Sequence, residues 1–254
     1  MIKSSSTISK VPPITLYFWL IKLLSTAMGE ATSDFLVYHS NPYVAVLLGL
    51  LGFVITFILQ IKAKRYIAWI YWLFIVMIAI FGTMVADVTH VVLGVPYLWS
   101  SLTYAILLTF VFIIWFRVEK TLSIHSINTR RRELFYFAAV VATFAMGTAL
   151  GDMSAMTLHL GYLTSGLLFI LLFLLPAIGF KSFRWNPIFS FWFAYIITRP
   201  LGASFADWFS KPATITGLGY GDGIVAILLT ILIVVLVAYL SLTKIDDTNE
   251  TTTR

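Results

Sequence analysis

The sequence has no cysteine and few charged residues: only 11% of its 254 residues are Asp, Glu, Lys or Arg. The missing cysteine excludes disulfides, thiolate metal sites and cysteine nucleophiles. Soluble domains carry about 25% charged residues, so this chain is not an ordinary soluble domain. Hydrophobic residues make up 60% of it, and its mean hydropathy is +0.94. This composition is typical of an integral membrane protein.

Long apolar runs fill most of the chain. A helix needs about 20 mainly apolar residues to cross a bilayer, whereas the strands of a membrane barrel alternate in pieces of about ten. The runs here are continuous, which predicts an all-α, polytopic membrane protein. The eight expected transmembrane helices are residues 14–38, 42–61, 66–92, 97–116, 133–158, 161–180, 186–209 and 222–243.

The expected spans fall into two halves. Residues 14–119 hold the first four spans and residues 133–244 hold the last four. A polar, basic stretch at residues 120–132 is expected to link the halves. Residues 1–13 and 245–254 are expected to form polar tails.

Basic residues are unevenly distributed over the predicted loops and tails. Fourteen of the 17 Lys and Arg residues fall on the side that holds both tails, whereas the opposite side has only Lys211. By the positive-inside rule this bias predicts that both termini are cytoplasmic. The net charge of +6 then reflects topology and contact with the lipid bilayer, and we expect no nucleic-acid partner.

A motif of Gly, four residues and Asp recurs in each odd-numbered span. It reads GEATSD from Gly29, GTMVAD from Gly82, GTALGD from Gly147 and GASFAD from Gly202. The regular spacing indicates four repeats of two helices each. Because two spans return the chain to the same side, the repeats are parallel. The four aspartates are therefore expected at similar depth, about 7 Å beyond the glycines.

Polar residues continue the motif along one helical face, since residues four apart lie on the same face. The even-numbered spans are nearly all apolar, so we expect the odd helices to line the centre and the even helices to face lipid. The predicted cation ligands are Glu30, Asp34, Asp87, Asp152 and Asp207, and the secondary candidates are Lys22, Thr26, Thr83, His90, Thr148, His159 and Arg199.

The charges at membrane depth do not balance. Each costs about 2.5–3.5 kcal/mol even on the lenient insertion scale, and five carboxylates with two bases, Lys22 and Arg199, leave a formal charge of −3. One interpretation is a closed structural network that locks the repeats together; the other is a pathway for a cation or a proton. Carboxylates suit hard cations, and together with His90 and His159 they would suit divalent Mn, Zn or Fe. Glu30 is the deepest acid and the candidate for a proton-coupled switch.

Two groups of glycines can be interpreted, those of the repeated motif and those between the last two spans. The motif glycines are expected to let helices pack closely. The stretch GLGYGD from Gly217 resembles part of a potassium-channel filter, but a filter needs four copies around one axis and this chain has one. Gly217, Gly219, Gly221 and Gly223 are therefore expected to form a flexible turn.

The chain resembles a family of bacterial membrane proteins built from four copies of a repeat of unknown function, some of them labelled aluminium-tolerance proteins. The matching stretches are KLLSTAMGEATSD, GTMVAD, GTALGD and TRPLGASFADW. The resemblance implies eight helices in a bacterial plasma (inner) membrane and a link to metal tolerance, without an established activity.

Together these features favour a membrane transporter, in the direction of export, for a divalent or trivalent metal cation, with proton coupling as an option. The alternatives are a cation channel with an acidic ring, or a non-transporting scaffold with a buried charge network. We expect no enzymatic activity, because the HExxH, GxSxG and aspartate-rich phosphotransferase motifs are missing. We expect no cofactor, the cation being the substrate, and a homodimer is left open.

Overall fold

The computed structural model describes residues 9–246, and within that range the chain is all-helical. The outermost parts of the two predicted tails, residues 1–8 and 247–254, lie outside the described residues. The α-helices are α1 (Leu16–His39), α2 (Pro42–Lys62), α3 (Ala68–Asp87), α4 (Tyr97–Glu119), α5 (Arg130–Asp152), α6 (Gly161–Phe183), α7 (Pro187–Ser210) and α8 (Asp222–Thr243).

Local capping signals set several helix starts. Asn41 and Asn186 accept hydrogen bonds from the first free amides of α2 and α7, each followed by a proline at the first helical position. Thr129 caps α5 by accepting from the amide of Arg132. This cap starts α5 at Arg130, inside the predicted linker, and not at residue 133 as expected.

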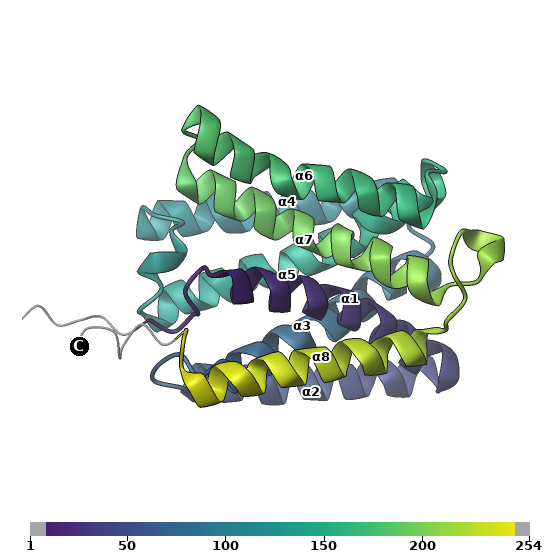
Figure 1. Ribbon diagram of the computed structural model, residues 1–254, viewed down its shortest axis with the longest axis horizontal. Helices are drawn as coiled ribbons and strands as arrows, with labels where there is room; N and C mark the ends of the chain where they lie inside the picture. The colour runs from purple at the N-terminus through teal and green to yellow at the C-terminus, as the bar shows by residue number, and fades with distance from the viewer. Residues whose placement is uncertain (1–8, 247–254) are drawn as a thin grey trace, which may run out of the picture.

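The four odd helices form a closed ring. In this ring α1 contacts α3, α3 contacts α5, α5 contacts α7, and α7 contacts α1. Each even helix packs mainly on the odd helix of the next repeat: α2 on α3, α4 on α5, α6 on α7, and α8 back on α1. In Figure 1, α2 and α8 flank the ring below while α4 and α6 flank it above. The odd helices thus lie at the centre of a bundle with quasi-fourfold order.

The motif glycines permit the close contacts of the ring. A Cβ added to Gly29 would lie 2.3 Å from the Cβ of Ala79, and one added to Gly202 would lie 2.0 Å from Oγ1 of Thr26. Each glycine faces the residue three positions before the motif glycine of the next odd helix. The four pairs are Gly29 with Ala79, Gly82 with Phe144, Gly147 with Arg199 and Gly202 with Thr26. These contacts agree with the expectation that the motif glycines let the odd helices pack closely.

Of the eight α-helices among residues 9–246, six are long and apolar enough to cross a membrane: α2, α3, α4, α5, α6 and α8. The even helices bury only 17–28% of their apolar stretch, compared with 61% for α3 and 72% for α5. Helices α1 and α7 have 24 residues each but contain charges that point inward. The set suggests a multi-pass membrane protein, and the eight-span topology stays a prediction.

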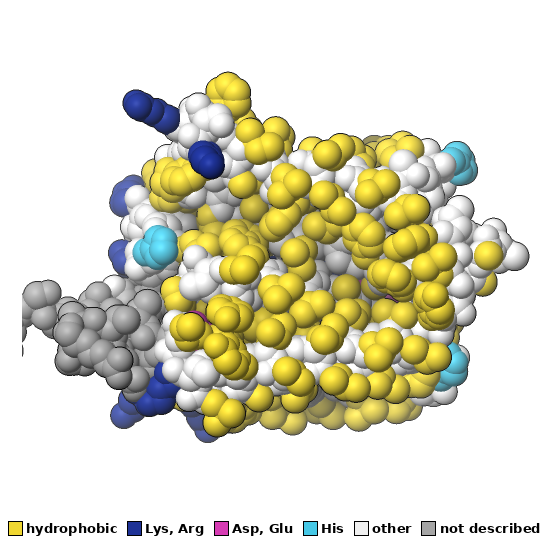
Figure 2. Space-filling view, viewed as in Figure 1, with side chains coloured by type: hydrophobic (Ala, Val, Ile, Leu, Met, Phe, Trp, Pro, Cys, Tyr) yellow, Lys and Arg dark blue, Asp and Glu magenta, His cyan; other side chains and the backbone are white. Residues whose placement is uncertain are grey.

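The surface separates apolar from basic side chains. Hydrophobic side chains cover most of the face shown in Figure 2, while Lys and Arg gather at one end. We call this the basic end; it holds the α2–α3, α4–α5 and α6–α7 connections. The α7–α8 loop lies at the opposite end, which we call the far end (Figure 1).

The glycine-rich α7–α8 loop is fixed, so its interpretation as a flexible turn was wrong. The amides of residues 218, 219, 220 and 221 donate to the last carbonyls of α7 and to that of Lys211, at N···O distances of 2.6 to 3.1 Å. Gly219 and Gly221 have φ of +81° and +85°, which favours glycine. The loop therefore completes the C-terminal cap of α7, which sequence spacing alone did not reveal.

Gly217→Ala is expected to destabilise the protein by about 1–3 kcal/mol, because overpacking forces backbone shifts of that cost. The added Cβ would lie 1.9 Å from the carbonyl oxygen of Lys211. Gly52→Ala in α2 is the matched control, since its Cβ would meet only the mobile end of the Met77 side chain. Thermal unfolding in detergent should show a lower midpoint for the first variant alone; equal midpoints would contradict a fixed loop.

Candidate functional site

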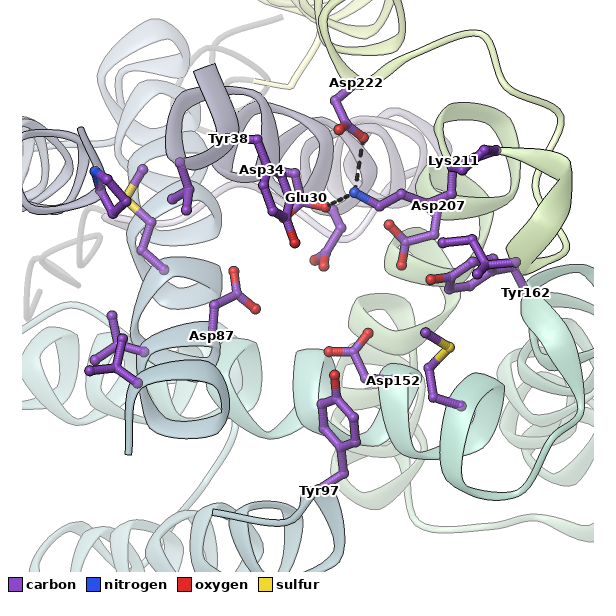
Figure 3. A pocket seen from close by; sticks show the side chains of 18 of the residues that line it. Glu30, Asp34, Tyr38, Asp87, Tyr97, Asp152, Tyr162, Asp207, Lys211 and Asp222 are labelled. Carbon is purple, nitrogen blue, oxygen red and sulfur yellow. Dashed lines mark hydrogen bonds and ion pairs between the residues drawn. The ribbon is translucent and has the colours of Figure 1, made fainter. Parts of the chain in front are cut away.

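A cavity of about 510 Å³ lies between the odd helices at the far end. Figure 3 shows acidic side chains pointing into it from several helices. All five predicted cation ligands line it: Glu30, Asp34, Asp87, Asp152 and Asp207. We call this cavity the acidic chamber. It brings together one motif aspartate from each repeat.

Two of the four motif aspartates are followed by a change of helix type. A π-helical turn (Val88–Val92) begins directly after Asp87, and another (Met153–Thr157) begins directly after Asp152. Helix α1 continues beyond Asp34, and α7 beyond Asp207, as ordinary α-helix. Single π-helical turns occur frequently at functional sites. The α3 and α5 side of the chamber thus differs from the α1 and α7 side.

Three acids on the α1 and α7 side form the tightest cluster. One carboxylate oxygen each from Glu30, Asp34 and Asp207 lie within 4.8 Å of one another. Hard cations bind oxygen at about 2.0–2.6 Å, so two oxygens that flank one ion lie up to about 5 Å apart. Glu30 and Asp207 are 3% and 4% exposed, and the Asp34 side chain is 13% exposed. The spacing fits one shared cation.

Three motif aspartates have no partner of their own. No hydrogen bond or ion pair to the carboxylates of Asp87, Asp152 or Asp207 occurs among residues 9–246. A buried charge is costly unless it is paired. Asp207 is almost fully buried and faces the chamber. These side chains are therefore suited to receive a positive charge from outside the chain.

Arg199 lies directly below the acidic chamber, bonded to Glu30 in its lining, and we call this position the floor of the chamber. Its guanidinium is fully buried and donates to Glu30, to Thr83 and, at 2.6 Å, to Thr148. These three acceptors each follow a motif glycine by one residue, and they belong to α1, α3 and α5. An arginine from α7 thus ties the other three odd helices together.

Thr26 and Lys22 lie below this floor. Thr26 donates its hydroxyl to the carbonyl of Thr198 at 3.1 Å. The Lys22 ammonium is 3.9 Å from the ring centre of Phe144 and 4.3 Å from that of Tyr195, in cation–π geometry. Lys22 has no hydrogen-bond partner within the described chain, so this base, counted against the carboxylates in the charge balance, contacts none of them.

Sequence reasoning missed two charged residues that line the acidic chamber, Lys211 and Asp222. The Lys211 ammonium pairs with Asp34 and, at 3.1 Å, with Asp222 (Figure 3). Burial lowers the pKa of Lys211, but Asp34 and Asp207 outweigh burial and raise this pKa on balance. The available signal was that Lys211 is alone among basic residues on its side of the predicted topology.

Adding both residues leaves the charge deficit unchanged. Six carboxylates now face or adjoin three bases, Lys22, Arg199 and Lys211, and the formal charge stays at −3. The structure therefore keeps the uncompensated charge that the sequence indicated.

The structure does not bring the two candidate histidines into the acidic chamber. His90 bonds through Nδ1 to the carbonyl of Val95 at 2.7 Å and stacks on Tyr97. His159 is exposed in the α5–α6 connection, with φ of +54°. Tyrosines line the chamber instead: Tyr38, Tyr97 and Tyr162. The carboxylates and phenol groups of the lining offer oxygen ligands, which suit hard cations, and the thioethers of Met84 and Met156 also line the chamber.

Comparison with known proteins agrees with the internal repeats. The model of the family described as Repeat of Unknown Function (DUF347) matches the chain four times, at residues 17–66, 70–121, 135–182 and 190–246. No curated protein and no solved structure matches the chain. Each matched segment holds one motif glycine and one motif aspartate. The chain therefore belongs to the Repeat of Unknown Function (DUF347) family.

Proposed function

We propose that this protein is a membrane transporter, in the direction of export, for a divalent or trivalent metal cation, and not an enzyme. The observation that carries the proposal is the acidic chamber. Four aspartates, one from each repeat, line it together with Glu30, and three of them make no hydrogen bond or ion pair among residues 9–246. Oxygen ligands of this kind favour hard cations.

A carrier is favoured over an open channel because the path below the acidic chamber is filled. Arg199 and Lys22 are buried there, and below them lies a core of large aromatic side chains. Its fully buried members include Phe18, Tyr71, Trp72, Tyr136 and Tyr195. A cation can reach the basic end only if the helices move, which is how carriers alternate access.

A purely structural charge network is less favoured. Such a network does exist at the floor, where Arg199 bonds with Glu30, Thr83 and Thr148. The partnerless carboxylates of Asp87 and Asp152 are not part of it. Both are half-buried and bond to no residue of the described chain, so they tie no helices together and a scaffold has no physical reason to keep them.

The charge distribution suggests the orientation. We propose that the basic end is cytoplasmic, following the positive-inside rule, in a bacterial plasma membrane. The acidic chamber then faces the outside in this structure, which is the side on which an exporter releases its cargo.

The test is cation flux through the purified protein in liposomes, with Mn²⁺, Fe²⁺, Zn²⁺, Mg²⁺ and Al³⁺ offered separately. We expect saturable flux of at least one of them, and its loss when the four motif aspartates are changed to Asn. Glu119→Gln is the control, since Glu119 pairs with Arg131 and Arg132 at the basic end. Flux equal to that of empty liposomes for every ion would contradict the proposal.

A further inference from the structure

The Lys211 ammonium lies inside the acidic chamber, where a transported cation would bind. It contacts Asp34, and Asp34 is one of the three acids whose oxygens lie within 4.8 Å of one another. It also lies 5.3 Å from the ring centre of Tyr38. One ligand of the candidate cation site is therefore already in use by a positive charge of the chain itself.

The backbone that carries Lys211 is fixed. Its amide donates to the carbonyl of Asp207 at 2.8 Å, and its carbonyl accepts from the amide of Gly219, also at 2.8 Å. Gly217 packs directly against that carbonyl. Only the long, flexible side chain is free to move, so the ammonium can swing while its attachment point stays in place.

A second acceptor lies within reach of the same ammonium. Asp222, the first residue of α8, pairs with Lys211 at 3.1 Å. Both residues line the chamber, and the side chain of each is 14% exposed. If a cation takes Asp34, the Lys211 charge keeps one carboxylate partner.

This charge is specific to one repeat. Lys211 lies nine residues after its motif glycine, and the equivalent residues of the other repeats are the uncharged Tyr38, Val91 and Met156. Three repeats therefore place no cation at this level. The lysine is an addition to the common plan, and the packing of the ring does not require it.

We propose that Lys211 is a tethered counter-ion that competes with the transported cation for Asp34 and rests on Asp222 while the cation is bound. This inference rests on the proposed function and concerns how the same site releases its cargo. When the cation leaves, the ammonium returns to Asp34, so the empty site is not left with that carboxylate unpaired. Lys211 thereby weakens binding and favours release at the far end.

Tb³⁺ is a suitable probe, because it binds hard oxygen ligands and its luminescence is sensitised by nearby tyrosines such as Tyr97 and Tyr162. The full chain in detergent is titrated with Tb³⁺. Lys211→Met should bind about 10-fold more tightly, within the usual range of coupling between two sites. Lys211→Arg keeps the charge but grips Asp34 with a planar fork, so it should bind more weakly than wild type. Lys181→Met at the basic end is the matched control and should leave binding unchanged.

Because the chain has no cysteine, a cysteine introduced at position 211 is its only thiol. The positive charge can therefore be restored chemically on the folded variant. In Lys211→Cys, an aminoethyl methanethiosulfonate forms a mixed disulfide with the thiol, releases methanesulfinate and restores an ammonium. This treatment should return the tightened affinity to the wild-type value, whereas the neutral methyl reagent should not.

The outcomes separate the role of Lys211 from the function of the chamber. If Lys211→Met binds no more tightly than wild type, the counter-ion role is overturned while the cation site stands. If Lys211→Arg binds Tb³⁺ as tightly as wild type does, only the positive charge at position 211 matters. Competition between the residue 211 side chain and the cation for Asp34 is then overturned. If neither wild type nor any variant binds Tb³⁺, the proposed function fails and the inference fails with it.

Discussion

Cation flux is expected to fall at least about 100-fold when Asp87 and Asp152 are both replaced by Asn. Each 1.4 kcal/mol of lost binding free energy corresponds to about tenfold, and each carboxylate is expected to account for about one such step. Both side chains line the acidic chamber, and neither has a partner among residues 9–246. Asn has nearly the same shape but carries no charge, so the chamber would lose two of the carboxylates that attract the cation. Flux through liposomes measures the effect.

The same variant separates a transporter from a scaffold by its stability. Removing these two carboxylates should leave the midpoint of thermal unfolding unchanged or higher, because both are half-buried and neither makes a hydrogen bond or ion pair that would be lost. A scaffold built on these charges would instead be destabilised. A lowered midpoint, together with wild-type flux no greater than that of empty liposomes, would therefore favour the scaffold, and Glu119→Gln serves as a control at the basic end.

The second large effect concerns the floor of the chamber. Arg199→Met is expected to destabilise the protein by about 3–5 kcal/mol, because removing one partner of a buried ion pair leaves the other charge uncompensated. Glu30 would be that charge, at 3% exposure. Chemical unfolding monitored by tryptophan fluorescence measures the change. Arg131→Met is the control: the Arg131 side chain is 67% exposed in its ion pair with Glu119, so its removal should change the free energy of unfolding little.

A double-mutant cycle identifies the cause of the destabilisation by Arg199→Met. If the cost of Arg199→Met comes from an unpaired Glu30, the combination with Glu30→Gln should regain about 1–3 kcal/mol. Simple addition of the two single effects would indicate that Arg199 stabilises the ring through Thr83 and Thr148 instead.

The sequence predicted the central arrangement because its signals repeat. Four copies of the Gly and Asp pattern marked the helices that form the ring, and the apolar even spans marked those that cover it. Gly29 and Gly202 were expected to pack closely, and each faces the next odd helix. The chamber acids, among them Asp87 and Asp152, were found for the same reason, since helical spacing places repeated residues at equal depth.

Contacts outside the repeat could not be predicted in the same way. Lys211 meets Asp34 and Asp222 only because backbone hydrogen bonds fold the α7–α8 loop onto α7. Spacing along one helix does not report such a loop. Lys22 faces aromatic rings and not a carboxylate, because the position of a partner on another helix depends on helix rotation, which periodicity leaves open.

The most direct test of the central claim is to locate a bound cation. Crystals of the wild-type protein soaked in Tb³⁺ should give their strongest anomalous peak in the acidic chamber, between Glu30, Asp34 and Asp207, and the peak should vanish in the variant with four Asn substitutions. Peaks confined to the basic end or the outer surface, or a chamber peak that persists in the variant, would contradict a cation site formed by the motif aspartates.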